Sequence, residues 1–139
     1  MRQSSFYSLF IFFLFGGIPN SNICIGTSSA NYQRLQESTY DLIKTAIIEK
    51  KSMTFYYNGF LRKASPHVLG TKNGREQALF MQYDGYSESG LSEDLRYNWR
   101  CFFLNKIRNP SLNDDEFYTT NNHSRNQSCV DVEDVIVDY

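Results

Sequence analysis

The chain has 139 residues with a formal net charge of −1, and 41% of its residues are hydrophobic, 16% aromatic and 21% charged. This length suits one domain of ordinary size, and this composition excludes an intrinsically disordered chain. Because aromatic residues favour strands, a β-rich domain is expected.

The chain begins with an uncharged apolar run, FYSLFIFFLFGGI, which covers residues 6–18 behind Arg2. The run is short for a membrane-spanning helix but suits the apolar core of a signal peptide. A translated upstream extension, caused by a wrongly assigned start, is the alternative interpretation. In both cases we expect residues 1–33 to lie outside the fold and residues 36–139 to form the domain.

One helix is expected between Ser38 and Lys50. Ser38 and Asp41 resemble a capping box in which Asp replaces Glu. Apolar residues recur at helical spacing on one face. These residues are Leu42, Ile43, Ala46 and Ile47.

After the helix the apolar period changes from 3.6 to 2, which predicts short strands. The expected strands cover residues 52–58, 60–65, 67–71, 77–84, 99–107 and 131–139. Asn58-Gly59 favours a hairpin turn because both residue types tolerate positive φ, and residues 72–75 are expected to form another turn. Pro66 and Asn109-Pro110 are expected to end strands.

Two architectures fit this order of elements. A mainly β fold with one N-terminal helix and about five short antiparallel strands suggests a small barrel. An open α+β sheet with the helix on one face is the alternative. Residues 85–98 form a polar loop that is long enough to serve a function.

Charge is unevenly distributed along the chain. Residues 44–75 contain seven basic residues and one acid, Glu49, whereas residues 113–139 contain seven acids and one basic residue, Arg125. A basic middle suits an anionic partner. The alternative is that both regions are ordinary solvated faces.

The cysteines and histidines predict neither a disulfide framework nor a metal site. Three cysteines, Cys24, Cys101 and Cys129, are an odd and sparse set, and Cys101 is expected to pack in the core. His67 and His123 are the only histidines, and no CxxC or HxxxH spacing occurs. No catalytic constellation is evident, so we expect no enzyme, no cofactor and no metal.

The stretch from residue 46 to residue 107 carries a resemblance to a known family. Its ordered motifs are AIIEKKSMTFYYNGFLR, the PHxxG turn at Pro66, His67 and Gly70, the strand ALFMQYD with its Gly/Ser loop, and NWRCFFLNKI. This set resembles a WYL domain, especially small WYL-like bacterial proteins that lack an attached DNA-binding domain. The match extends over roughly residues 36–139, and the order of the motifs is more specific than any one of them.

The resemblance implies an SH3-like, Sm-like β-barrel with an N-terminal helix. It also implies a non-enzymatic regulatory module that binds a nucleotide or single-stranded nucleic acid, and it carries ligand contacts over to Arg62 and Arg100, with His67 nearby in sequence. A separate DNA-binding or effector protein is a further expected partner. The chain departs from the family at Gln77-Ala78-Leu79, where only Leu79 of the Trp-Tyr-Leu pattern remains.

Each candidate ligand-binding residue also has a structural interpretation. The arginine forks of Arg62 and Arg100 suit phosphate oxygens, and Tyr83 and Trp99 suit stacking on bases. Arg100 could instead form an internal ion pair with Asp84 or Glu88, and Tyr83 and Trp99 could pack in the core. His67 could stabilise a turn by hydrogen bonding.

The sequence supports two locations for the protein. The family resemblance implies the cytoplasm. The apolar N-terminal run implies an exported or membrane-tethered interaction protein that has lost ligand binding.

Overall fold

The structure is a computed structural model that describes residues 37–123 and 126–139. The apolar run predicted to be a leader lies outside these residues. Within the described part of the chain, no helix has the length and hydropathy needed to span a bilayer. The elements are, in chain order, α2 (Thr39–Glu49), β1 (Met53–Tyr57), β2 (Phe60–Lys72), β3 (Arg75–Gly85), the 3-10 helix η2 (Leu95–Tyr97), β4 (Trp99–Phe103), the 3-10 helix η3 (Leu104–Lys106), β5 (Arg108–Leu112) and β6 (Val132–Ile136).

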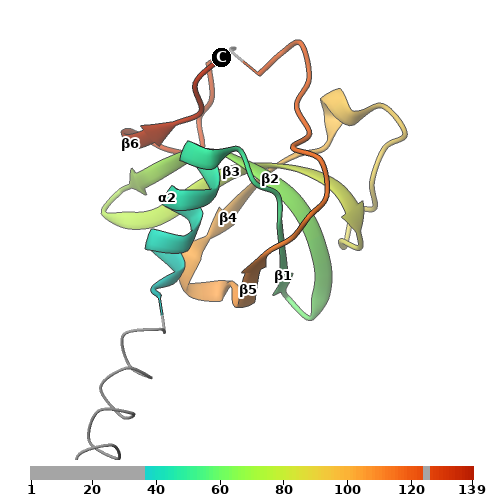
Figure 1. The fold of residues 1–139 in the computed structure, drawn as a ribbon, viewed down its shortest axis with the longest axis horizontal. Coiled ribbons are helices and arrows are strands. Elements are labelled where there is room, and N and C mark those ends of the chain that lie inside the picture. Colours follow the sequence, from blue (N-terminus) through green and yellow to red (C-terminus); the bar gives the residue numbers. More distant parts are fainter. Residues whose placement is uncertain (1–36, 124–125) are drawn as a thin grey trace, which may run out of the picture. The chain divides into compact units, whose positions relative to one another are not determined.

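The strands form one antiparallel sheet of six strands, in the order β4-β3-β2-β1-β5, with β6 paired to β2 (Figure 1). Strand β2 pairs with β3 along its length, with β1 near its beginning and with β6 near its end. Helix α2 packs against β2, β5 and β6. The described residues therefore confirm the predicted mainly β fold with one α-helix. The sheet is not closed, so a barrel is not confirmed.

Helix α2 begins and ends where its sequence predicts. The Ser38 hydroxyl oxygen accepts a hydrogen bond from the Asp41 N–H at 3.0 Å, which satisfies one of the free donors at the helix start. At the other end, Lys50 adopts a left-handed conformation with φ of 54°. The apolar face of α2 thereby comes to rest on the sheet, where Ile43, Ala46 and Ile47 are buried.

Both predicted hairpin turns are present. Asn58 and Gly59 have φ of 53° and 81°, and Asn73 and Gly74 have φ of 53° and 79°. Two successive positive φ values match the right-handed twist of the flanking strands. These turns set the registers that bring Met53 opposite Ala64 and Gln77 opposite Gly70.

Neither proline ends a strand as expected. Pro66 lies inside β2, at a register shift opposite β3 and between the stretches that pair with β1 and β6. Pro110 lies inside β5, an end strand of the sheet, beside a register shift between Thr54 and Tyr56 of β1. Because proline lacks an N–H, it is tolerated where a ladder is interrupted or at a sheet edge.

The core lies between α2 and the face of the sheet on which this helix packs. The rings of Phe55, Phe80 and Phe102 are at most 2% exposed and contact one another with centroids 5.1–5.4 Å apart. These tilted and edge-to-face arrangements are the favoured geometries for aromatic pairs. On β4, the alternation of side chains that buries Phe102 directs its neighbours away from this core.

Candidate ligand-binding pocket

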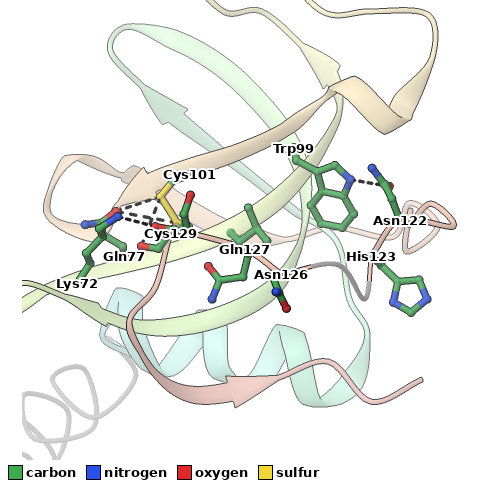
Figure 2. A pocket seen from close by; sticks show the side chains of 11 residues that line it. Lys72, Gln77, Trp99, Cys101, Asn122, His123, Asn126, Gln127 and Cys129 are labelled. Carbon is green, nitrogen blue, oxygen red and sulfur yellow. Dashed lines mark hydrogen bonds between the residues drawn. A yellow bond between two sulfur atoms is a disulfide. The ribbon is translucent and has the colours of Figure 1, made fainter.

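A pocket of about 450 Å³ opens beside β3 and β4, against the polypeptide that leads toward β6 (Figure 2). Lys72 at the end of β2, Gln77 and Leu79 on β3, and Trp99 and Cys101 on β4 contribute to its lining. The rest of its described lining comes from residues 122–123 and 126–129. None of these described lining residues is Asp or Glu, whereas Lys72 supplies a positive charge.

Trp99 is held in a defined orientation at this pocket. Its indole Nε1–H donates to Thr120 Oγ1 at 3.2 Å and to Asn122 Oδ1 at 3.1 Å. Its ring also meets the His67 ring edge-to-face, with centroids 4.6 Å apart. Trp99 is the only tryptophan of the chain, so tryptophan fluorescence reports on this residue and its immediate surroundings.

A disulfide between Cys101 and Cys129 forms another part of the pocket wall. This bond corrects the expectation drawn from the odd cysteine count, because two of the three cysteines pair across 28 residues. The expectation that Cys101 packs in the core is also wrong. Since Phe102 faces the core, strand alternation turns Cys101 outward, and it is exposed.

Lys72 lines the same pocket as the disulfide. Its ammonium donates a hydrogen bond to the Ser128 carbonyl at 2.6 Å, which ties the end of β2 to the residue before Cys129. Gln77 Oε1 lies 3.0 Å from Cys101 Sγ and 4.0 Å from Cys129 Sγ. A cation, an amide and a disulfide therefore lie together, as Figure 2 shows.

His67 lies at a second, neighbouring pocket of about 420 Å³, which shares His123, Asn126 and Gln127 with the first. His67 is buried within β2, so it does not stabilise a turn after Pro66. Its Nδ1–H donates to the Ser65 carbonyl at 2.9 Å, which leaves Nε2 to accept from the Thr119 hydroxyl at 3.0 Å.

The environment of His67 keeps its imidazole neutral. Burial lowers the pKa of His67 to about 4, and the nearby His123 adds to the decrease. The arrangement of Thr119, His67 and the Ser65 carbonyl resembles a nucleophile, a base and an orienting group. A base with so low a pKa is weak, and a structural role for these hydrogen bonds is favoured.

Arg62 is buried in the sheet and faces neither pocket. Its guanidinium donates to the Tyr57 carbonyl at 3.1 Å and to Gln82 Oε1 at 3.3 Å, and it pairs with Glu88 Oε1 at 3.3 Å. Its Nε has no hydrogen-bond partner. The guanidinium carbon also lies 5.5–5.6 Å from the ring centroids of Tyr57, Phe60 and Phe102. All of these contacts are made within the fold, so they fit a structural role for Arg62.

Arg100 braces the long loop through backbone carbonyls. It donates to Gly90 O at 2.8 Å, Tyr97 O at 3.2 Å and Trp99 O at 3.3 Å. The carboxylate of Glu88, one of the two ion-pair partners considered for Arg100, binds Arg62 instead. The loop-bracing role is therefore present, with carbonyls in place of a carboxylate.

Tyr83 also lies away from both pockets. Its ring stacks on Tyr118 with centroids 4.3 Å apart, and its hydroxyl donates to Asp115 at 2.7 Å. Burial and the bond to Asp115 raise the pKa of Tyr83. The tyrosine thus anchors the segment after β5 to β3.

Of the five residues singled out from the sequence, Trp99 lines the first pocket and His67 the second, and their rings touch. Arg62, Arg100 and Tyr83 lie elsewhere. Sequence reasoning missed Lys72, Gln77 and the disulfide. The spacing of Cys101 two residues after Trp99 on one strand was the available signal, because such residues share a face.

The basic middle and the acidic tail partly neutralise each other in the fold. Lys44 Nζ lies 3.8 Å from Asp134, and Lys63 Nζ lies 3.9 Å from Asp115. Both pairs are solvent-exposed and contribute little stability. Part of the positive charge that suggested an anionic partner is therefore paired with carboxylates of the same chain.

No protein-family model, no curated protein and no solved structure matches this chain. Its resemblance to WYL domains stays a prediction from the residues.

Proposed function

We propose that this protein is a non-enzymatic, WYL-like regulatory module that binds a nucleotide or short single-stranded nucleic acid in the pocket beside Trp99. The observation that carries the proposal is the combination of an oriented indole, the Lys72 ammonium and a described lining without carboxylates. Such a lining suits a planar group that carries negative charge.

The chemistry of the pocket matches the two halves of a nucleotide. Base stacking on an aromatic side chain contributes about 1–3 kcal/mol. Lys72 offers two further ammonium protons beyond the one that binds Ser128, and phosphate oxygens accept such donors. The amides of Gln77 and Asn126 in the lining are suited to hydrogen bonds with base edges.

We also propose that the sheet is a barrel of the family's type and that the module acts through a partner protein. Strand β2 spans 13 residues and pairs with β1, β3 and β6, which supports a partly open barrel of the SH3-like, Sm-like type. A regulatory module acts through another protein. The expected partner is therefore a separate DNA-binding or effector protein in the cytoplasm, which would bind this chain differently with and without the ligand.

A binding panel tests this proposal. The purified protein is titrated with adenine and guanine nucleotides and with short single-stranded oligonucleotides at low and high salt. We expect binding that weakens with salt, and Lys72→Gln should weaken it further while Lys51→Gln, at an exposed lysine outside the pocket, should not. Absence of salt-dependent binding across the panel would reject the proposal.

One observation favours a second candidate function. Disulfides persist mainly in oxidising compartments, so Cys101–Cys129 favours an exported or membrane-tethered interaction protein. The mass of the native chain's N-terminus, measured together with its cell fraction, tests this. Cleavage near Gly26 or Ala30 outside the cytoplasm would support export, whereas a cytoplasmic chain that starts within residues 30–40 would contradict it.

A further inference from the structure

We propose that Cys101–Cys129 is a reactive disulfide, at which an incoming thiolate attacks Cys101 Sγ and Cys129 leaves as the thiolate. The pocket wall is thereby a site of thiol modification. The inference goes beyond the proposed function and does not depend on it, because the reacting group is the disulfide itself and the co-reactant is a small thiol or dithiol.

The two ends of the disulfide differ in access. Cys101 is exposed on β4, which is an end strand of the sheet, whereas Cys129 is buried with 7% of its surface exposed. Both line a pocket of about 450 Å³, which leaves room for a small thiol beside the bond. Because exchange rates depend on which sulfur a thiolate can reach, the attack is directed to Cys101.

One neighbour of Cys129 favours a leaving thiolate, although the cysteine itself is buried beside Val68 and Val130. Lys72 lines the same pocket, and its ammonium is bonded to the carbonyl of Ser128, the residue before Cys129. A nearby cation lowers the pKa of a thiol, and a thiol of lower pKa leaves faster. Among the described lining residues no carboxylate opposes this effect.

Gln77 supplies an acceptor for the reduced state. Its Oε1 lies 3.0 Å from Cys101 Sγ, yet a disulfide sulfur carries no proton to donate. Once Cys101 is a thiol, its S–H can donate to this oxygen without movement of the backbone. The same oxygen is 4.0 Å from Cys129 Sγ, so it is placed to serve either thiol.

The exchange balances without any other oxidant or reductant. In the first step the thiolate forms a mixed disulfide with Cys101, the Cys101–Cys129 bond breaks, and its electron pair stays on Cys129. With a dithiol, the second thiolate then attacks the mixed disulfide and releases Cys101. The dithiol is oxidised by two electrons to its own disulfide, and the protein gains two thiols.

The rest of the fold retains the tail when the bond opens. Strand β6 stays paired with Val68–Thr71 of β2, and Lys72 stays bonded to Ser128. The reduced chain is therefore expected to remain folded, with the wall of the pocket released from β4. This property distinguishes a reactive disulfide from a purely structural crosslink.

The test uses the full chain with Cys24→Ser, so that only the two paired cysteines remain. Reduced glutathione is added in native buffer, free thiols are blocked, and the adduct is located by peptide mass. We expect the mixed disulfide on Cys101. With dithiothreitol we expect complete reduction in native buffer, an unchanged far-ultraviolet circular dichroism spectrum, and reoxidation by oxidised glutathione.

A matched pair of variants tests the role of the cation. Because the Lys72 ammonium favours the leaving thiolate, Lys72→Gln should slow reduction about threefold, while Lys51→Gln should leave the rate unchanged. Any of three results would overturn the proposal: reduction only in denaturant, loss of the folded spectrum on reduction, or an adduct on Cys129. Equal rates for the two lysine variants would overturn the role of Lys72.

Discussion

Arg62 Nη2 lies 3.3 Å from Glu88 Oε1, so a buried cation in β2 is paired with an exposed carboxylate in the loop that follows β3. The pair joins the centre of the sheet to a loop that Arg100 also holds, through the Gly90 carbonyl. Both arginines were ligand candidates in the sequence, each with a structural role as the alternative.

Replacement of Arg62 should strongly destabilise the protein. Arg62→Ala leaves the Tyr57 carbonyl and Gln82 without their donor and opens a cavity among aromatic rings. We expect the free energy of unfolding to fall by about 3 kcal/mol. Urea unfolding checks this, with Lys51→Ala as the exposed control that should change little. A loss for Arg62→Ala as small as that of the control would show that the contacts of the guanidinium are not stabilising.

The pH dependence of stability should report His67. The folded pKa of His67, about 4, lies below its ordinary value of 6.5. Between these two pH values the His67 imidazole is therefore protonated in the unfolded chain but neutral in the folded chain. Stability is then fully present above about pH 6.5 and falls by about 3 kcal/mol as the pH drops to about 4.

The comparison is made in a His123→Gln background, where His67 is the only histidine. Adding His67→Gln should flatten the pH profile across this window. Hydrogen bonds from its own backbone N–H, Asn58 and Arg62 lower the pKa of Glu88 below its ordinary value of 4.5, so its stabilising contribution starts to be lost below about pH 4.5. Both proteins of the comparison contain Glu88, so its contribution cancels in the difference between their profiles. An unchanged profile would contradict the buried neutral state of His67.

Gly70 should accept no side chain. A Cβ at this position would lie 2.6 Å from Val130 Cγ1 and closer still to the Val132 carbonyl, so the tail would have to leave β2. We expect Gly70→Ala to lower the free energy of unfolding by about 3 kcal/mol. Gly59→Asn is the control, because its Cβ meets open space and Asn tolerates positive φ. Thermal unfolding of the two variants should differ clearly, and equal losses would contradict the close packing of β6.

Removal of the disulfide should lower stability without abolishing the fold. The bond closes a loop across 28 residues, for which loop-closure entropy gives about 3–4 kcal/mol. The double variant Cys101→Ser with Cys129→Ser should therefore unfold at lower denaturant concentration with the same native spectrum. A variant that is unfolded in native buffer would contradict this and the proposed reduced state together.

Local signals in the sequence predicted much of the fold. The Ser38 cap, the period of the helix and the two Asn-Gly turns act over a few residues, and the structure confirms all of them. The prolines were misjudged because their cost depends on the neighbouring strand. Pro66 and Pro110 both lie beside register shifts, which depend on pairing across the sheet.

The candidate site was less predictable for a related reason. Trp99 and Cys101 share a face of β4, but Cys129 joins them only because the tail pairs with β2. The partner of Glu88 likewise depended on which arginine the loop approaches in space. The ligand contacts implied by the family resemblance stay a prediction.

The most direct test of the central claim is the emission of Trp99 during a titration with AMP and with a short single-stranded oligonucleotide. Because Trp99 is the only tryptophan, a ligand that stacks in the pocket should quench its emission along a saturable curve. Lys72→Gln should shift that curve to higher concentration, and Lys51→Gln should not. Emission that stays unchanged at saturating concentrations of both probes, in a protein that remains folded, would contradict a nucleotide site at this pocket.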